Sequence, residues 1–149
     1  MTRTDPRDPD AMALITAHIT RSTSVYPSQA SYVLDAEALA RSGARVYLLR
    51  RHGTPVAIGA LRDLGATLWE IKSMHTKVDH RGVGHGRVML AHLIAEARAA
   101  GCTRLCLETG SDDASAAARA LYANAGFRET GPFADYPPHP LSVFMDLAL

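Results

Sequence analysis

The sequence is poor in the features that mark several large classes of protein. It has two cysteines, Cys102 and Cys106, with no second pair beside them, so we expect packing residues rather than a disulfide framework or a structural zinc site. The formal net charge is only +1, which disfavours a nucleic-acid binder or a binder of acidic membranes. No apolar run approaches the roughly 20 residues of a membrane span, and the opening MTRTDPRDPDA is too polar for a signal peptide, so we expect a cytoplasmic protein.

What the sequence does contain is the composition of a folded domain. Hydrophobic residues make up 47% and charged residues 21%, which is typical of a globular chain. The 149 residues are enough to bury a core, and no linker, repeat or low-complexity segment divides them. We therefore predict one domain over residues 1–149.

Helical and strand patterns alternate along this domain. Asp8 and Pro9 form a helix start, and apolar residues then recur at helical spacing, with His18 on that stripe as an expected core histidine. The other elements expected in this half are a loop at 22–34, a short helix at 35–43, and strands at 44–51, 55–63 and 66–76. Short connections between the three strands predict an antiparallel meander.

In the third of these strands, the period of two places side chains on alternate faces. One face is predicted to carry Glu70, Lys72 and Met74, and the other Trp69, Ile71 and Ser73. Glu70 and Lys72 should therefore be neighbours.

The second half continues the alternation. The further elements expected are a helix ended by Gly101, a strand at 103–109, a helix from Asp112 or Asp113 to Gly126, and strands at 127–129 and 141–147. This strand and helix order implies at least one parallel pair in an otherwise antiparallel sheet.

The stretch HRGVGHGR, residues 80–87, joins the third strand to its helix. No lysine with a following Ser or Thr is placed for a P-loop, and Arg87 stands where a dinucleotide fingerprint needs its third glycine. A turn of unhindered amides at a helix N-terminus is a site for an anion, and Arg81 and Arg87 could add charge-assisted bonds to a phosphate. A tight turn that needs glycine for its dihedral angles is the simpler alternative.

Two motifs resemble the signatures of the GNAT N-acetyltransferase superfamily. Arg81-x-x-Gly84-x-Gly86 is similar to the family loop that binds the pyrophosphate of acetyl-CoA, and ARALYANAGF, residues 118–127, is similar to the second signature. The series EIKSM, RGVGHG, LETG, LYANAGF, PFADY and SVFM resembles a subgroup of small bacterial members. The resemblance implies an α/β fold of the α+β type: a mixed, mostly antiparallel sheet of about six or seven strands, about four helices and a splayed parallel strand pair.

The resemblance also implies a cofactor site. Acetyl-CoA would be the cosubstrate, with no metal, and the histidines have no metal-ligand spacing. The residues expected to contact acetyl-CoA are Met74, His75 and Thr76 on the strand, Arg81, Gly82, Val83, Gly84, His85, Gly86 and Arg87 in the loop, and Ser115. Ser115 stands where many members have an asparagine that bonds to pantetheine.

Two catalytic roles follow from the same resemblance. Tyr122 occupies the position of the family tyrosine that faces the CoA sulfur, so it is the expected general acid; a tyrosine packed in the core is the alternative. Glu70 lies 11 residues before Arg81, where the histone-acetylating branch has its base, and it could act directly or through water. The alternative for Glu70 is an exposed strand carboxylate paired with Lys72.

The acceptor site is expected across the sheet from CoA, between the loop after the first helix and the tail loop. The candidates are Tyr26, Tyr32, Phe133, Asp135, Tyr136 and His139, with Glu108 and Asp135 able to hold a cationic amine. These loop residues could equally serve only to close the core.

The function expected from the resemblance is an acetyl-CoA-dependent N-acetyltransferase that acts on a primary amine of a small molecule or peptide, by direct attack in a ternary complex. A non-catalytic acyl-CoA sensor or interaction module is the competing class. Neither nucleic acid nor membrane is an expected partner, and a homodimer is an open alternative to a monomer.

Overall fold

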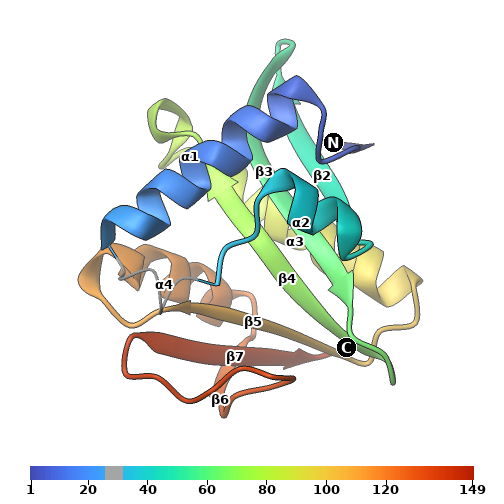
Figure 1. Ribbon diagram of the computed structural model, residues 1–149, viewed down its shortest axis with the longest axis vertical. Coiled ribbons are helices and arrows are strands. Elements are labelled where there is room, and N and C mark those ends of the chain that lie inside the picture. Colours follow the sequence, from blue (N-terminus) through green and yellow to red (C-terminus); the bar gives the residue numbers. More distant parts are fainter. Residues whose placement is uncertain (26–31) are drawn as a thin grey trace.

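A seven-stranded sheet with helices on both faces forms the part of the chain that the structure describes, residues 1–25 and 32–149 of a computed structural model (Figure 1). The strands are β1 (Thr2–Thr4), β2 (Arg45–Arg51), β3 (Thr54–Asp63), β4 (Leu68–Thr76), β5 (Arg104–Gly110), β6 (Arg128–Thr130) and β7 (Ser142–Ala148), in the order β1-β2-β3-β4-β5-β7-β6. The helices are α1 (Pro9–Val25), α2 (Ala36–Arg41), α3 (His85–Ala99) and α4 (Ala116–Asn124). This is the predicted fold class; only β1, too short to show alternation, was not expected.

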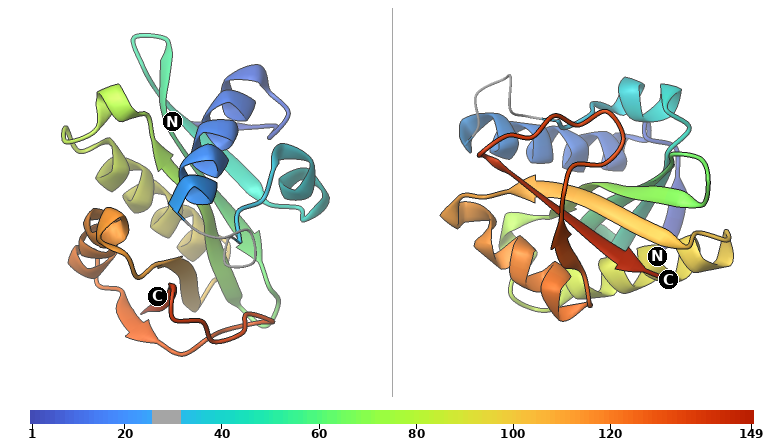
Figure 2. Two further views of the ribbon diagram at one scale, coloured as in Figure 1. Left: turned by 60° about the vertical axis from the view of Figure 1, so that its left-hand side comes forward. Right: turned by 90° about the horizontal axis from the view of Figure 1, so that it is seen from below.

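The helices cover the two faces of the sheet in pairs (Figure 2). α1 and α2 lie on one face, where Leu14, Ile15 and Leu39 pack on β2 and β3. α3 and α4 lie on the other, larger apolar layer. Both cysteines are buried and free, which confirms that they are packing residues. No helix within the described ranges is long and apolar enough to cross a membrane.

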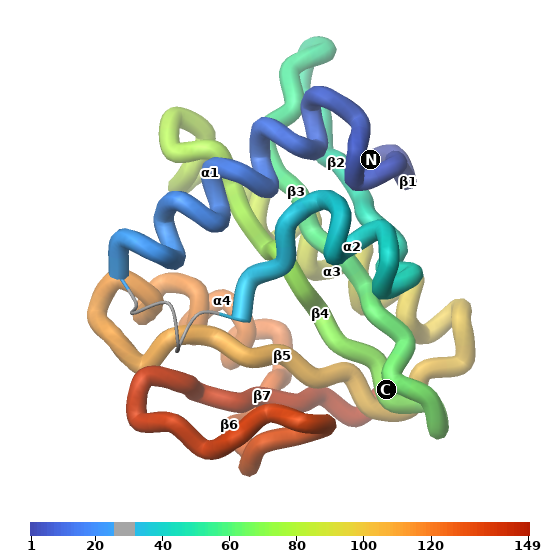
Figure 3. The backbone as a smooth tube through the Cα atoms, in the orientation of Figure 1, coloured from blue at the N-terminus to red at the C-terminus, as the bar shows by residue number. Residues whose placement is uncertain are grey.

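The only parallel pair in the described sheet is β4 with β5, and it is short. Its ladder joins residues 68–70 to residues 104–106 and then stops. Beyond this point β4 still pairs with β3 as far as Thr76, and β5 still pairs with β7 as far as Gly110. β4 therefore stays paired with β3, and β5 stays paired with β7, but β4 and β5 no longer pair with each other. The sheet opens at its centre as a result (Figure 3). The predicted splayed pair is confirmed.

β4 contains a bulge close to this opening. On its β3 side, Ala60 is opposite Lys72 and Ile58 is opposite His75, so β4 has one residue more than β3 over this interval. Ser73 lies in the bulge with a φ of 55°, in the left-handed region that non-glycine residues rarely adopt. The extra residue reverses the alternation of side chains beyond it.

The bulge corrects the predicted assignment of faces. Met74 does not share a face with Glu70, because it packs against the apolar layer beneath α3 and α4. His75 instead projects toward α1, where its ring centroid is 5.7 Å from that of His18. Period-two alternation is valid only for a regular strand, and the sequence carries no clear sign of the extra residue.

Candidate active site

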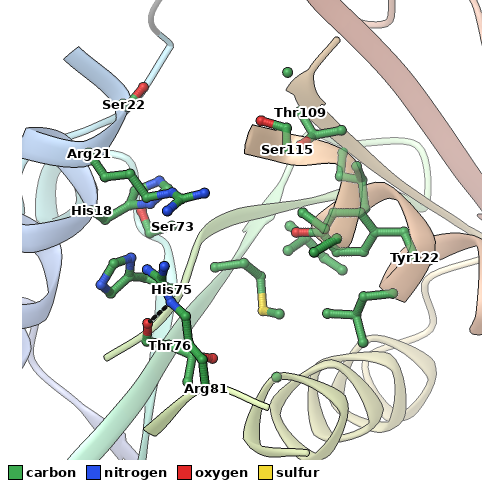
Figure 4. A pocket seen from close by; sticks show the side chains of 18 of the residues that line it. His18, Arg21, Ser22, Ser73, His75, Thr76, Arg81, Thr109, Ser115 and Tyr122 are labelled. Atoms are coloured by element: carbon green, nitrogen blue, oxygen red, sulfur yellow. Dashed lines mark hydrogen bonds between the residues drawn. The ribbon is translucent and has the colours of Figure 1, made fainter. Parts of the chain in front are cut away.

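A cavity of about 860 Å³ lies where β4 and β5 diverge (Figure 4). Its volume is in the range of small-molecule and cofactor sites. The predicted residues that line it are Met74, His75, Thr76, Arg81, Gly82, Val83, Gly84, His85, Gly86, Arg87, Glu108, Ser115 and Tyr122. The fold thus brings the strand, the glycine loop and the second signature around one space.

The glycine loop has the geometry of an anion site. Gly82 and Gly84 have φ angles of 78° and 90°, and a Cβ built on either would have no atom within 4 Å, so open space lies beside this backbone. Gly84 is the N-cap of α3 and supplies no side-chain cap, which leaves the first N–H groups of the helix available. These groups carry partial positive charge, and the loop therefore fits the diphosphate of a CoA molecule.

Two side chains of this loop are tied to the backbone around it. Arg81 donates through Nε to the Thr76 carbonyl at 3.0 Å, and burial lowers the pKa of its guanidinium, with the charge of Arg21 adding to the effect. His85 Nδ1 lies 3.0 Å from the His80 carbonyl oxygen. The loop is consequently held against the end of β4, beside the opening of the sheet.

Tyr122 of α4 reaches the same cavity from the α3 side of the sheet. It is 6% exposed, and its ring centroid lies 5.9 Å from that of Phe127, so it both packs in the core and faces the cavity. Burial, and secondly the charge of Glu108, raise the pKa of the phenol well above its usual value. The group is therefore a neutral hydrogen-bond donor throughout the physiological pH range.

Glu108 of β5 is the carboxyl group that lines the cavity in the described chain. Burial raises its pKa to about 7. A carboxyl that titrates near neutral pH in a cavity has the properties of a general base. From the sequence, Glu108 was expected to hold a cationic amine. Its burial, which raises the pKa of the carboxyl, could not be inferred from the neighbouring residues in the chain.

Glu70 lies outside the cavity lining, in a buried cluster with the tail loop. It is 1% exposed; Tyr136 donates its hydroxyl to Oε1, and Lys72 Nζ lies 3.2 Å from the same oxygen. Lys72 also donates to the Tyr136 oxygen at 2.5 Å, and Arg62 lies 3.8 Å from Oε2. The predicted pairing of Glu70 with Lys72 is confirmed. The prediction that this carboxylate is exposed is wrong, because Tyr136 covers the pair. A role as base stays a prediction.

Of the other residues predicted to bind the acceptor, some line the cavity and others do not. Tyr32 lines the cavity, and its ring meets that of Tyr136 edge to face at 5.0 Å. Phe133 is buried beneath Tyr136, whereas Asp135 is exposed and does not line the cavity. Tyr26 lies outside the described residues. The tail loop thus forms a wall behind Tyr32 rather than contributing its carboxylate to the cavity.

Sequence reasoning missed the residues of α1 that line the cavity, which are His18, Arg21, Ser22 and Val25. His18 lines the cavity and is not part of the apolar core, so the prediction of a core histidine is wrong, although its ring is shielded enough from solvent for burial to lower its pKa. A signal was present in the chain: His18 and Arg21 are three residues apart and so share one face of a helix.

A sheet that opens between two central parallel strands, with an anion-binding turn at the opening, is the arrangement expected of an acyl-CoA acyltransferase. The family model described as acetyltransferase (GNAT) family matches residues 12–127, and the chain belongs to this family.

Individual relatives agree with this assignment. The chain is 40% identical over 126 residues to an IAA acetyltransferase of Azospirillum brasilense, covering 84% of this chain and 81% of the relative. The crystal structure of an acyl-CoA N-acyltransferase from Klebsiella pneumoniae has a TM-score of 0.82 with 33% identity, covering 99% of this chain and 95% of that one. A Bacillus subtilis acetyltransferase solved in complex with CoA shares the fold, with a TM-score of 0.64 and 17% identity over 76% of this chain and 81% of that one.

Proposed function

We propose that this protein is an N-acetyltransferase that moves an acetyl group from acetyl-CoA to a primary amine of a small molecule or peptide, by direct attack in a ternary complex. One observation carries the proposal: a single cavity is lined both by the glycine turn at the start of α3 and by two ionisable groups suited to acyl transfer, Glu108 and Tyr122. The CoA complex of the Bacillus subtilis protein supports CoA as the acyl carrier.

The chain offers a binding surface along the length of such a cosubstrate. The turn from Gly82 to Gly86 would receive the diphosphate, with Arg81 and Arg87 beside it. The inner edge of β4 from 71 to 76 has no ladder to β5, so its backbone groups can pair with the pantetheine amides. A backbone N–H of this edge would polarise the thioester carbonyl, which is the electrophile that acetyl-CoA supplies.

Glu108 and Tyr122 would then handle the protons. Glu108 takes one proton from the ammonium form of the acceptor, and the free amine forms the C–N bond. The nitrogen then releases its second proton to solvent as the C–S bond breaks with its electron pair on sulfur. Tyr122 donates a hydrogen bond to this sulfur. Since the pKa of the phenol is raised, stabilising the thiolate by hydrogen bonding costs less than full proton transfer, and the solvent can supply the final proton. Glu70 is the second candidate for the base, but its bonds to Tyr136 and Lys72 favour Glu108.

The test is calorimetric binding of acetyl-CoA followed by thiol release over a panel of amines. Tyr122→Phe should lower kcat about 100-fold while leaving acetyl-CoA affinity unchanged. Tyr47→Phe is the matched control, because its hydroxyl bonds to Glu96 at 2.9 Å and Tyr47 does not line the cavity. Binding without thiol release for any amine would instead indicate an acyl-CoA sensor, and no binding would refute the proposal.

A further inference from the structure

Basic side chains gather where the end of α1 passes over the end of β4. Figure 4 shows His18 and Arg21 of α1 beside His75 of β4, with Arg81 below them. Together with Lys72 of β4, all of them line the cavity. His18 and His75 are close enough for their ring centroids to lie 5.7 Å apart.

Ion pairs among the described residues balance only part of the charge of this cluster. Lys72 has Glu70 as a partner, but within the described ranges neither Arg21 nor Arg81 forms an ion pair. Burial lowers the pKa of both His18 and His75 to about 4; His75, Lys72 and Arg21 add to the effect on His18, and Arg81 and Arg21 add to it on His75. Two neutral imidazoles thus stand beside two uncompensated guanidinium groups, an environment that favours an anion.

Arg21 is placed to bind such an anion at the rim of the cavity. Its Nη2 donates to the Ala114 carbonyl at 2.8 Å, which holds the guanidinium across the opening between α1 and the turn before α4. A guanidinium has five N–H donors, and among the described residues Ala114 is the one hydrogen-bond partner of this side chain, so further donors can meet a ligand. Arg21 belongs to α1 and the proposed diphosphate turn precedes α3, on opposite faces of the sheet, although the opening leaves Arg21 near enough to Arg81 for its charge to lower the pKa of that guanidinium.

Building on the proposed function, we infer that the amine acceptor carries a carboxylate, which Arg21 binds together with His18 and His75 while the amine is directed to Glu108. The acceptor class is therefore an amino acid or a similar small zwitterion. Glu108 is on β5 and Arg21 is on α1, so the two ends of the acceptor would meet different walls of the cavity. The same guanidinium groups would repel polyamines and other acceptors without an anion.

The first experiment compares thiol release with free amino acids and with the amides of the same amino acids, at saturating acetyl-CoA. We expect transfer to members of the free amino acid series and a far higher KM for the matching amides. Transfer only to the amides, or to neither series while acetyl-CoA still binds, overturns the acceptor class but not the binding of the cofactor. Failure to bind acetyl-CoA would overturn the proposed function as well.

The second experiment uses Arg21→Gln, since glutamine keeps an N–H donor for the Ala114 carbonyl. The KM for the carboxylate acceptor should rise about 10- to 100-fold, the KM for its amide should not change, and Arg21→Lys should restore part of the loss. A rise in the KM for acetyl-CoA instead would assign the guanidinium to a cofactor phosphate and overturn the inference.

An NMR titration provides a readout that a structural role of Arg21 would not give. The probes are the N-acetyl derivatives of the amino acids and of their amides, added with CoA. A bound carboxylate should raise the pKa of His18 and His75, because a nearby negative charge favours the imidazolium forms. The amide derivatives should leave both values unchanged, and equal shifts with the two probe sets would overturn the inference.

Discussion

Replacing Gly84 by aspartate separates an anion site from a tight turn. Gly84 has a φ of 90° and a ψ of 3°, and a side chain in this region costs about 1–2 kcal/mol. No atom lies within 4 Å of its Cβ position, so no steric term is added. The free energy of unfolding should fall by only about 1–2 kcal/mol, which lowers Tm by about 2–8 °C in a chain of this length.

The effect of Gly84→Asp on binding should be larger than its effect on stability. The new carboxylate would stand beside the amides that are proposed to bind a diphosphate. Two like charges about 5 Å apart at an effective dielectric constant of about 20 repel by about 3 kcal/mol, and screening in this open loop reduces that to about 1–3 kcal/mol. The Kd for acetyl-CoA should therefore rise about 10- to 100-fold.

Two controls separate charge from backbone strain in this experiment. Gly84→Asn has the same shape as the aspartate variant without its charge, and should lose clearly less affinity. Gly43→Asp introduces the same side chain at a φ of 70°, also with open space around it and outside the cavity, and should lose stability without losing affinity. Calorimetry gives both quantities. The reasoning is refuted if Gly84→Asp binds acetyl-CoA within about twofold of the unaltered protein, or if Gly43→Asp weakens binding as much.

Three further substitutions test the ionisable groups. Glu108→Gln should abolish the rise of kcat/KM with pH around pH 7, because the carboxyl has a pKa of about 7 and must be ionised to act as base; an unchanged profile places the base elsewhere. The Glu108 pKa of about 7 lies above the ordinary 4.5, so the unaltered protein should lose stability as pH rises from about 4.5 to about 7. In urea unfolding over this pH range, Glu108→Gln should lose less stability than the unaltered protein. For His18 the dependence of stability on pH has the opposite sign, because its pKa of about 4 lies below the ordinary 6.5 and stability is lost as pH falls from about 6.5 to about 4. His18→Asn should reduce that loss. Identical curves of stability against pH for the variant and the unaltered protein would count against a ring that burial keeps neutral. Tyr136→Phe removes a donor from buried Glu70 and should cost about 1–3 kcal/mol in urea unfolding, whereas a cost near zero would show that the cluster contributes nothing.

The features predicted correctly from the sequence are those set by local physical chemistry. The alternation of strands and helices follows from apolar periodicity, and the tight turn before α3 follows from glycines that adopt positive φ before a helix. The long-range consequence of the strand order, a parallel pair at the centre of the sheet, could also be reached from the order of elements alone.

What the sequence could not provide depends on non-local packing. The extra residue at Ser73 has no local signature, although it decides that His75 faces α1 and Met74 does not. The covered state of Glu70 depends on Tyr136, which is 66 residues away in the chain. The position of the Arg21 side chain likewise depends on a distant residue, because the carbonyl that it bonds to is 93 residues away in the chain. Contacts of this kind follow from the assembled fold rather than from spacing.

The short ladder between β4 and β5 divides the sheet into two halves that are joined by only three residue pairs in the described structure. A ligand that pairs with the open edge of β4 would bridge the opening beyond this ladder, and it would bind only the folded chain. At a concentration of about 100 times its Kd, such a ligand adds about 2.7 kcal/mol to the free energy of unfolding. With the proposed acyl-CoA as this ligand, the resistance of the protein to heat and proteases would rise with the supply of its own acyl donor.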